Sequence, residues 1–194
     1  LAAQYMRPDH PMLWPSVLRV LDRMSEETVD VNRRIQAGIV LLQYFGTTGH
    51  EAHARQLMGT LDRLIGTTGV TALNRSLASA FGGWCRHVLL AESAQALPLL
   101  GRAEAIAKEH CLVQALCNIN EFQGYAQIHM CIDLPQGEAA LERMAAIGFA
   151  DNSNRLAGSH CSKMRSCEWR GDTRLAKHHA ERCAEVAAVD GAQP

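Results

Sequence analysis

The chain has 194 residues, of which 47% are hydrophobic, 20% charged and only 5% aromatic. These hydrophobic and charged fractions are typical of a globular protein and argue against wholesale disorder. Lys and Arg number 19 against 20 Asp and Glu, a net charge of -1 that excludes a strongly basic nucleic-acid binder on composition alone. No apolar run approaches the roughly 18 residues that a membrane span needs. We therefore expect no membrane contact and no direct nucleic-acid contact by this segment.

The apolar residues recur at three- and four-residue steps almost throughout the chain, and no stretch alternates as a strand would. Glycines interrupt this pattern at residues 46–49 and 66–69, where left-handed backbone geometry can end a helix. The pattern predicts nine helices joined by short turns, at about residues 12–24, 31–45, 54–64, 71–91, 95–110, 112–131, 136–147, 152–169 and 172–188.

Several residues at the predicted helix ends are typical of helix termini. Asn152 or Ser153 would cap the eighth helix and Asp172 the ninth. Pro135 and Pro98 are expected in first turns, where the missing N–H of proline is tolerated. The sequence therefore supplies start signals as well as apolar periodicity.

Seven glycines lie inside the predicted helices beyond their first turns, where each costs about 1 kcal/mol relative to alanine in an exposed interior. We expect close helix packing to explain several of them, with a local hinge as the alternative at Gly82-Gly83. We expect Trp84 to pack in the core or a hairpin rather than to serve as a stacking platform. We expect Trp14 to pack in the first helix and Trp169 in the last hairpin. The seven glycines are Gly38, Gly59, Gly82, Gly83, Gly101, Gly124 and Gly158.

An asparagine, in three cases followed by arginine, recurs along the chain with spacings of 42, 44 and 36 residues, at Asn32, Asn74, Asn118 and Asn154. About seventeen residues after each comes a helix break, and a second, shorter helix follows. Stacked helix pairs would bury a continuous core that one pair cannot bury alone. The predicted organisation is a single helical-repeat domain over residues 1–194, with a half-unit at 1–27 and helix hairpins at 28–69, 70–111, 112–150 and 151–191.

Three stretches carry a resemblance to a known family: residues 44–54, residues 169–181 and residues 187–192. Together they resemble the tetratricopeptide-like superhelix of large bacterial transcriptional regulators of the maltose-regulator, ATP-dependent LuxR and antibiotic-regulator types. The strict tetratricopeptide signature is absent, and the spacings exceed its period of about 34 residues. The resemblance implies an all-α superhelix of antiparallel hairpins, whose partners include adjacent domains of the same chain.

The chain carries seven cysteines, an odd number, most of them within helical apolar patterns. This usage favours reduced thiols over a disulfide framework, and no secretory signal follows Leu1. We therefore predict a cytoplasmic location. Because the sequence begins at Leu1 rather than Met and ends at Pro194 without a tail, we also expect a fragment of a longer protein.

No catalytic motif is present in the sequence. None of the lysines at positions 108, 163 and 177 follows a glycine, so a P-loop is impossible. Neither a Gly-x-Ser-x-Gly elbow nor a His-Glu-x-x-His motif occurs, and His50-Glu51-Ala52-His53 resembles the latter only superficially. We predict a protein that is not an enzyme and has no cofactor.

The C-terminal histidines and cysteines are the best candidates for a metal site. His179 and Cys183 are four residues apart on one helix face, and His160 lies on the preceding helix of the same hairpin. Against a site, cysteine behaves as a small hydrophobe in helical cores. We predict no metal site and keep these three residues as candidates.

The anchor residues and their neighbours form the predicted partner site. In hairpin superhelices the first helix of each unit lines the concave surface, where a polar ladder would bind an acidic peptide or an anionic ligand. The alternative is that these residues cap helices and pair with Asp30, Asp151 and other acids between units. The predicted ladder consists of Arg34, Gln43, Arg75, Asn118, Glu121, Arg155 and Lys163.

The sequence thus favours a non-catalytic protein-interaction or ligand-sensing repeat domain of a bacterial transcriptional regulator. Its partner would be a protein, a peptide or a small-molecule inducer. One alternative is a stand-alone adaptor that binds peptide tails in a concave groove. Another is a zinc-binding helical protein.

Overall fold

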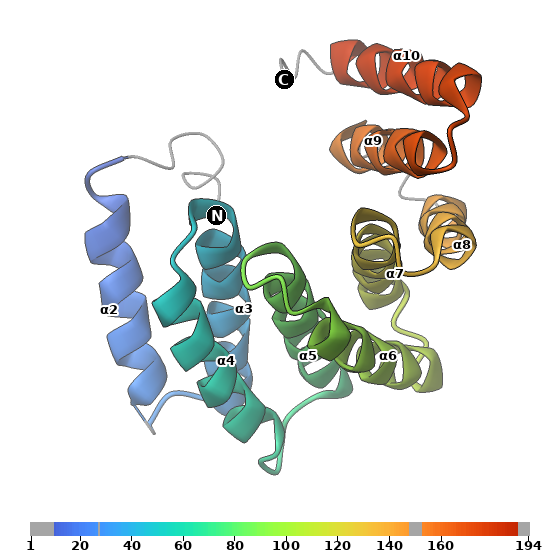
Figure 1. The fold of residues 1–194 in the computed structure, drawn as a ribbon. Helices are drawn as coiled ribbons and strands as arrows, with labels where there is room; N and C mark the ends of the chain where they lie inside the picture. Colours follow the sequence, from blue (N-terminus) through green and yellow to red (C-terminus); the bar gives the residue numbers. More distant parts are fainter. Residues whose placement is uncertain (1–9, 27, 148–152, 190–194) are drawn as a thin grey trace. The chain divides into compact units, whose positions relative to one another are not determined.

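The computed structural model describes residues 10–26, 28–147 and 153–189, and all regular structure in these ranges is helical (Figure 1). The all-α prediction is confirmed for this part of the chain. The helices are α2 (Leu13–Ser25), α3 (Val31–Thr48), α4 (Glu51–Ile65), α5 (Ala72–Val88), α6 (Ser93–Glu109), α7 (Val113–His129), α8 (Leu134–Ala146), α9 (Ser153–Trp169) and α10 (Thr173–Val189).

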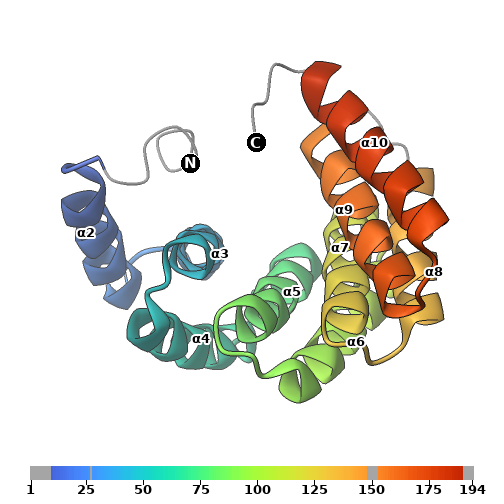
Figure 2. The same ribbon diagram turned by 45° about the horizontal axis from the view of Figure 1, so that its top comes forward.

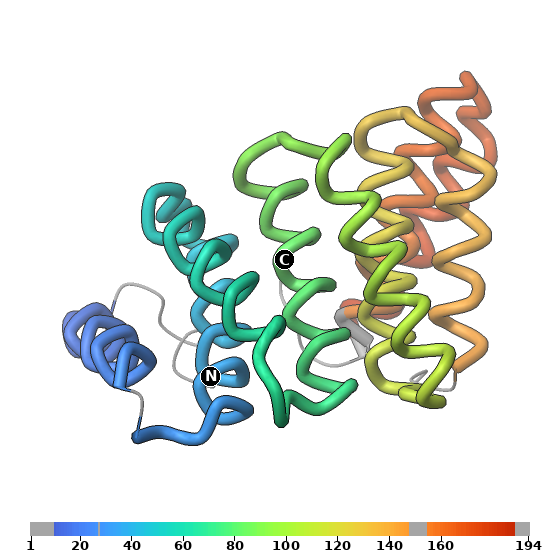
Figure 3. Tube along the Cα trace, turned by 90° about the horizontal axis from the view of Figure 1, so that it is seen from below, coloured from blue at the N-terminus to red at the C-terminus, as the bar shows by residue number. Residues whose placement is uncertain are grey.

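The chain divides into two compact units, with the boundary between His110 and Cys111. In the first unit, α3 packs against α2, α4 and α5, and α5 packs against α4 and α6. In the second unit, α7 packs against α8 and α9, and α9 packs against α10 (Figure 2). Within each unit the chain passes along one helix and returns along the next (Figure 3). Each unit is therefore a stack of helix pairs whose first helices contact one another.

Aliphatic side chains dominate the buried interior of both units. In the first unit, Ile35, Leu42 and Phe45 are fully buried on one face of α3, because positions three, four or seven residues apart share a helix face. In the second unit, Ile119 on α7 and Leu141 on α8 are fully buried. The low aromatic content of the sequence is thus reflected in cores that aliphatic residues fill.

Three of the turns within helix pairs use the same backbone geometry. Gly49, Cys131 and Gly171 have positive φ values of 81°, 51° and 74°. In each case the N–H of the following residue donates to the carbonyl five residues back, which satisfies a free carbonyl at the helix end. These bonds are His50 N to Phe45 O (3.2 Å), Ile132 N to Gln127 O (2.9 Å) and Asp172 N to Cys167 O (2.9 Å).

Side-chain caps then start the next helix at two of these turns. Asp172 accepts a hydrogen bond from the Leu175 backbone N–H at 2.9 Å, which confirms its predicted capping role. Asp133 caps α8 in the same way through Gln136, and Pro135 lies in the first turn as predicted. The predicted caps Asn152 and Ser153 cannot be assessed, because Asn152 and the Ser153 side chain lie outside the described residues.

The predicted end of α3 within residues 46–49 is confirmed, because the helix continues through Gly46 to Thr48 and Gly49 has the left-handed geometry. The structure corrects two other expectations. Pro98 is the sixth residue of α6, not a first-turn residue, since the helix already begins at Ser93. Trp169, which was expected to pack in the last hairpin, is 57% exposed at the end of α9.

Glycines permit close helix approach at several predicted positions. A Cβ on Gly38 would lie 2.7 Å from Leu61 Cδ2, and one on Gly124 would lie 2.6 Å from Leu141 Cγ. A Cβ on Gly158 would lie 2.5 Å from the Tyr125 hydroxyl, and one on Gly83 would lie 3.0 Å from Leu100 Cγ. The packing explanation therefore holds for these four glycines. Gly59, Gly82 and Gly101 have no such neighbour within 4 Å.

Two glycine-to-alanine variants test this distinction. Gly124→Ala should lower the free energy of unfolding by roughly 1–3 kcal/mol, because the fully buried Leu141 side chain must move. Gly101→Ala, on the exposed side of α6, should raise it by up to about 1 kcal/mol through helix propensity. Urea unfolding followed by circular dichroism measures both. A loss of stability in both variants would contradict the packing explanation.

Candidate functional site

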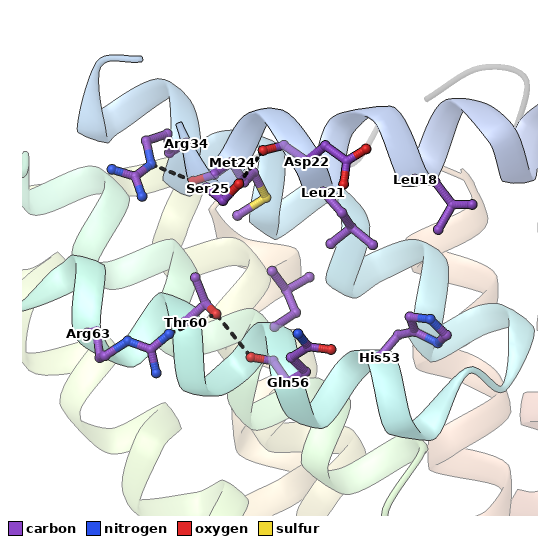
Figure 4. A pocket seen from close by; sticks show the side chains of 11 residues that line it. Leu18, Leu21, Asp22, Met24, Ser25, Arg34, His53, Gln56, Thr60 and Arg63 are labelled. Carbon is purple, nitrogen blue, oxygen red and sulfur yellow. Dashed lines mark hydrogen bonds between the residues drawn. The ribbon is translucent and has the colours of Figure 1, made fainter. Parts of the chain in front are cut away.

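The first unit contains a groove of about 640 Å³ between α2 and α4, both of which pack against α3 (Figure 4). Its walls combine aliphatic side chains with a few polar and charged ones. Its size falls within the range of small-ligand sites. The lining residues are Leu18, Leu21, Asp22, Met24, Ser25, Arg34, His53, Gln56, Leu57, Thr60 and Arg63.

Aromatic contacts join α2 and α4 near the start of both helices. The Trp14 ring stacks on His50 with a centroid distance of 4.6 Å, and it meets the edge of His53 at 5.2 Å. His50 precedes the first residue of α4 and also stacks on Tyr44 of α3. The histidines of the His50-Glu51-Ala52-His53 stretch are therefore packing partners of Trp14.

Two arginines lie at the end of the groove away from Trp14. The Arg34 Nε donates to the Met24 carbonyl at 2.6 Å, and Arg63 Nη2 donates to Thr60 Oγ1 at 3.2 Å. Figure 4 shows Arg34 and Arg63 on opposite walls at one end, with Leu18 and His53 toward the other. The predicted site residue Arg34 therefore borders a groove. Its bond to Met24 also anchors the C-terminal end of α2.

The next helix interval of the same unit is packed shut. A cavity of only about 10 Å³ remains among α3, α4, α5 and α6, with Leu42, Met58, Ala78 and Leu99 among its lining residues. Side chains from these four helices leave almost no space there. The open groove is therefore a property of the α2–α4 interval and does not follow from stacking helix pairs in general.

In the second unit the structure brings three predicted site residues together. Arg155 of α9 donates from Nη2 to Asn118 Oδ1 and, at 3.0 Å, from Nη1 to Cys117 Sγ of α7. Its Nε lies 3.5 Å from Glu121 Oε2, and Glu121 also accepts from the Tyr125 hydroxyl at 3.0 Å. Burial raises the pKa of the Glu121 carboxyl, and the Arg155 charge counteracts this. Asn118, Glu121 and Arg155 thus bind one another and fasten α9 to α7.

The other predicted site residues have local partners. Arg75 is exposed, and its Nη2 donates to the Thr67 carbonyl at 3.3 Å. The Lys163 Nζ lies 3.7 Å from the Glu142 Oε1. Gln43 is half-buried on α3, where its backbone carbonyl accepts from Thr47. The seven residues are divided between the two units: Arg34, Gln43 and Arg75 in the first and the remaining four in the second.

The asparagine repeat has a structural role in the first unit. Asn32 donates from Nδ2 to the Gly69 carbonyl at 3.0 Å, and its Oδ1 accepts from the Thr71 backbone N–H at 2.9 Å. Buried Asn74 donates to the same Oδ1 at 2.8 Å. These bonds fix the connection between α4 and α5 against α3. Asp30 caps α3 through the Arg33 N–H, whereas the predicted partner Asp151 lies outside the described residues.

The C-terminal histidines face one another between α9 and α10. The Nδ1 atoms of His160 and His179 are 3.1 Å apart, so one ring donates and the other accepts. Burial lowers the pKa of both rings, and the nearby Lys163 lowers both further. In the described part of the chain, no group of three or more His, Cys, Asp or Glu is arranged to hold a metal ion. His160 and His179 meet as a hydrogen-bonded pair, and Cys183 is half-buried on α10.

Sequence reasoning did not identify most of the groove. Arg63, His53 and Leu18 were not proposed as site residues, because nothing in helical periodicity shows that α2 diverges from α4. No sequence signal marks Leu18, which follows the apolar pattern of α2 yet is 40% exposed in the structure. Such exposure depends on which helices lie beside α2.

No family model matches the chain, and no curated protein or solved structure matches it. Among the described helices, none combines the length and the apolar character needed to cross a bilayer. The function is therefore inferred from the residues and their geometry alone.

Arg155 provides a test of the internally paired cluster. Arg155→Gln should lower the free energy of unfolding by about 2 kcal/mol, because it leaves Glu121 and Asn118 without their charged partner. The control Arg75→Gln removes an exposed arginine from the first unit and should change it by less than about 0.5 kcal/mol. Urea denaturation compares the two. Equal effects would contradict a structural role specific to Arg155.

The His160–His179 pair predicts acid sensitivity of the second unit. Both pKa values lie below the ordinary 6.5, so the unfolded chain takes up protons first as the pH falls. Stability is therefore fully present above about pH 6.5 and is lost as the pH falls through the lowered values. Lys163, Arg182 and His178 add positive charge around the pair, whereas Glu138 opposes them at His179.

His179→Gln should reduce the loss of stability between pH 7.5 and pH 5.5, because it removes one titrating ring and the repulsion between two charged rings. Thermal unfolding at the two pH values measures the effect. His110→Gln, at an exposed position after α6, serves as the control. An unchanged pH dependence in His179→Gln would show that the pair is not responsible.

Proposed function

We propose that this chain is a non-catalytic binding domain of the tetratricopeptide-like superhelical kind, within a cytoplasmic bacterial transcriptional regulator. Its role would be to bind a protein, a peptide or a small-molecule inducer and to transmit that event to adjacent domains of the same chain. The observation that carries the proposal is the open groove between α2 and α4, set beside a helix interval that is packed shut.

The contacts inside each unit support this proposal. First helices pack on first helices, α3 on α5 and α7 on α9, as expected for an array of hairpins. The repeated polar residues Asn32, Asn74 and Arg155 are used to join successive pairs. Because these residues serve packing, the groove is the better candidate for ligand binding.

A ligand in this groove would contact both α2 and α4 at once. It would favour whichever separation of the two helices gives it the better contacts, and the shift can be no larger than its difference in affinity for the two states. Arg34 links such a change to α3, because it donates to the last turn of α2. Ligand binding would thus be converted into a movement of α2 against the remaining stack.

A stand-alone adaptor for acidic peptide tails is the second candidate, and Arg34 and Arg63 at one end of the groove favour it. An adaptor would bind its peptide without any linked change in DNA binding. Its affinity would fall steeply with added salt, since exposed charge pairs are screened.

The full-length gene product tests the proposal. A regulator should bind a DNA fragment from its own promoter region, and a compound or peptide that raises the melting temperature of the protein should also change that DNA affinity. Gel-shift titrations with and without the stabilising compound measure this coupling. Stabilisation with unchanged DNA binding would favour the adaptor. Turnover of a substrate would contradict the non-catalytic assignment.

A further inference from the structure

We infer that the α2–α4 groove accommodates a small amphiphilic carboxylate, with its carboxylate between Arg34 and Arg63 and its linear apolar tail along Leu18, Leu21 and Leu57. This inference rests on the proposed binding function and names the class of ligand. It uses three observations: the shape of the groove, the distribution of its charges and its exposed aliphatic wall.

The groove runs along α4 from His53 to Arg63. Along α4, the ten residue-to-residue steps from His53 to Arg63 correspond to a rise of about 15 Å. The Trp14 contacts with His50 and His53 join the two helices near the start of that path. An extended chain would therefore enter with its tail toward Trp14 and its head group toward the arginines.

The charges are unevenly placed. The Nε of Arg34 donates to the Met24 carbonyl, which fixes the guanidinium at one end of the groove. Among the described residues, the Nη atoms of Arg34 and Nη1 of Arg63 have no hydrogen-bond partner in the protein. Guanidinium groups form strong, charge-assisted hydrogen bonds with carboxylates. Asp22 is the one acidic lining residue, and it would repel an anionic head group.

Between the charged end and Trp14, the α2 wall carries Leu18 and Leu21, whereas the α4 wall carries the polar Gln56 and Thr60 beside Leu57. Leu57 and Met24 are almost fully buried beneath the groove, while Leu18 is 40% exposed. A linear apolar tail would cover Leu18 and remove its surface from water, which is favourable in proportion to the buried area. A purely polar anion would leave this wall exposed, and a neutral apolar molecule would leave the two arginines unused.

Calorimetric titration with decanoate tests the inference. Decanoate should bind the purified chain, and decyltrimethylammonium, with a similar tail and the opposite charge, should bind at least tenfold more weakly. Arg63→Gln should weaken decanoate binding about tenfold, as expected for the loss of one charge-assisted hydrogen bond. Asp22→Asn should strengthen it, because a like charge is removed. The control Arg102→Gln, exposed on α6 in the same unit, should leave the affinity unchanged.

Arg63 is exposed and its hydrogen bond is to its own helix, so its substitution should not disturb the fold. Circular dichroism checks this, and Leu18→Gln provides a second variant that should also weaken binding. Equal binding of the two amphiphiles, or equal effects of Arg63→Gln and Arg102→Gln, would overturn the inference. If decanoate fails to bind while another compound or a peptide stabilises the protein, the ligand class is wrong and the proposed binding function stands. If no compound or peptide binds, both the inferred ligand class and the proposed binding function are wrong.

Discussion

The close approach of helices at glycine positions is the constraint on which the two units depend. A side chain on Gly124 would strike Leu141 of α8, and one on Gly158 would strike the Tyr125 hydroxyl of α7. Because α9 lies so near α7, Arg155 can reach Asn118 and Glu121. The polar cluster therefore follows from the packing of small residues. In the first unit Gly38 has the same relation to Leu61 of α4.

Two arginines show how the same residue type serves different ends. Arg155 is surrounded by acceptors on α7, so its charge is paired with groups inside the second unit. Arg34 uses one nitrogen to hold the end of α2 and directs the rest of its guanidinium to a groove. The difference arises from the neighbouring helices: α7 supplies partners at short range, whereas α2 and α4 leave a space.

Much of the fold could be predicted because helix signals are local. The periodicity of Ile35, Ile39 and Leu42 marks α3 from the sequence, and Asp172 caps α10 as predicted. Contacts with distant residues do not appear in these local signals. Gly46 lies inside α3, where a Cβ would come within 2.5 Å of the Trp84 ring from α5. Trp169 was expected to pack in the last hairpin, but it lies exposed at the end of α9.

For the candidate site too, some features follow from the local sequence and others depend on distant residues. The sequence by itself determined the helices, their order, the glycine breaks and the residues able to carry charge or hydrogen bonds, because these depend on neighbours within one or two helical turns. Only the tertiary structure decided that Asn118, Glu121 and Arg155 satisfy one another and that Arg34 borders an open groove with Arg63. Such pairings depend on the distance between helices, which the volumes of packed side chains set and which no periodic pattern contains.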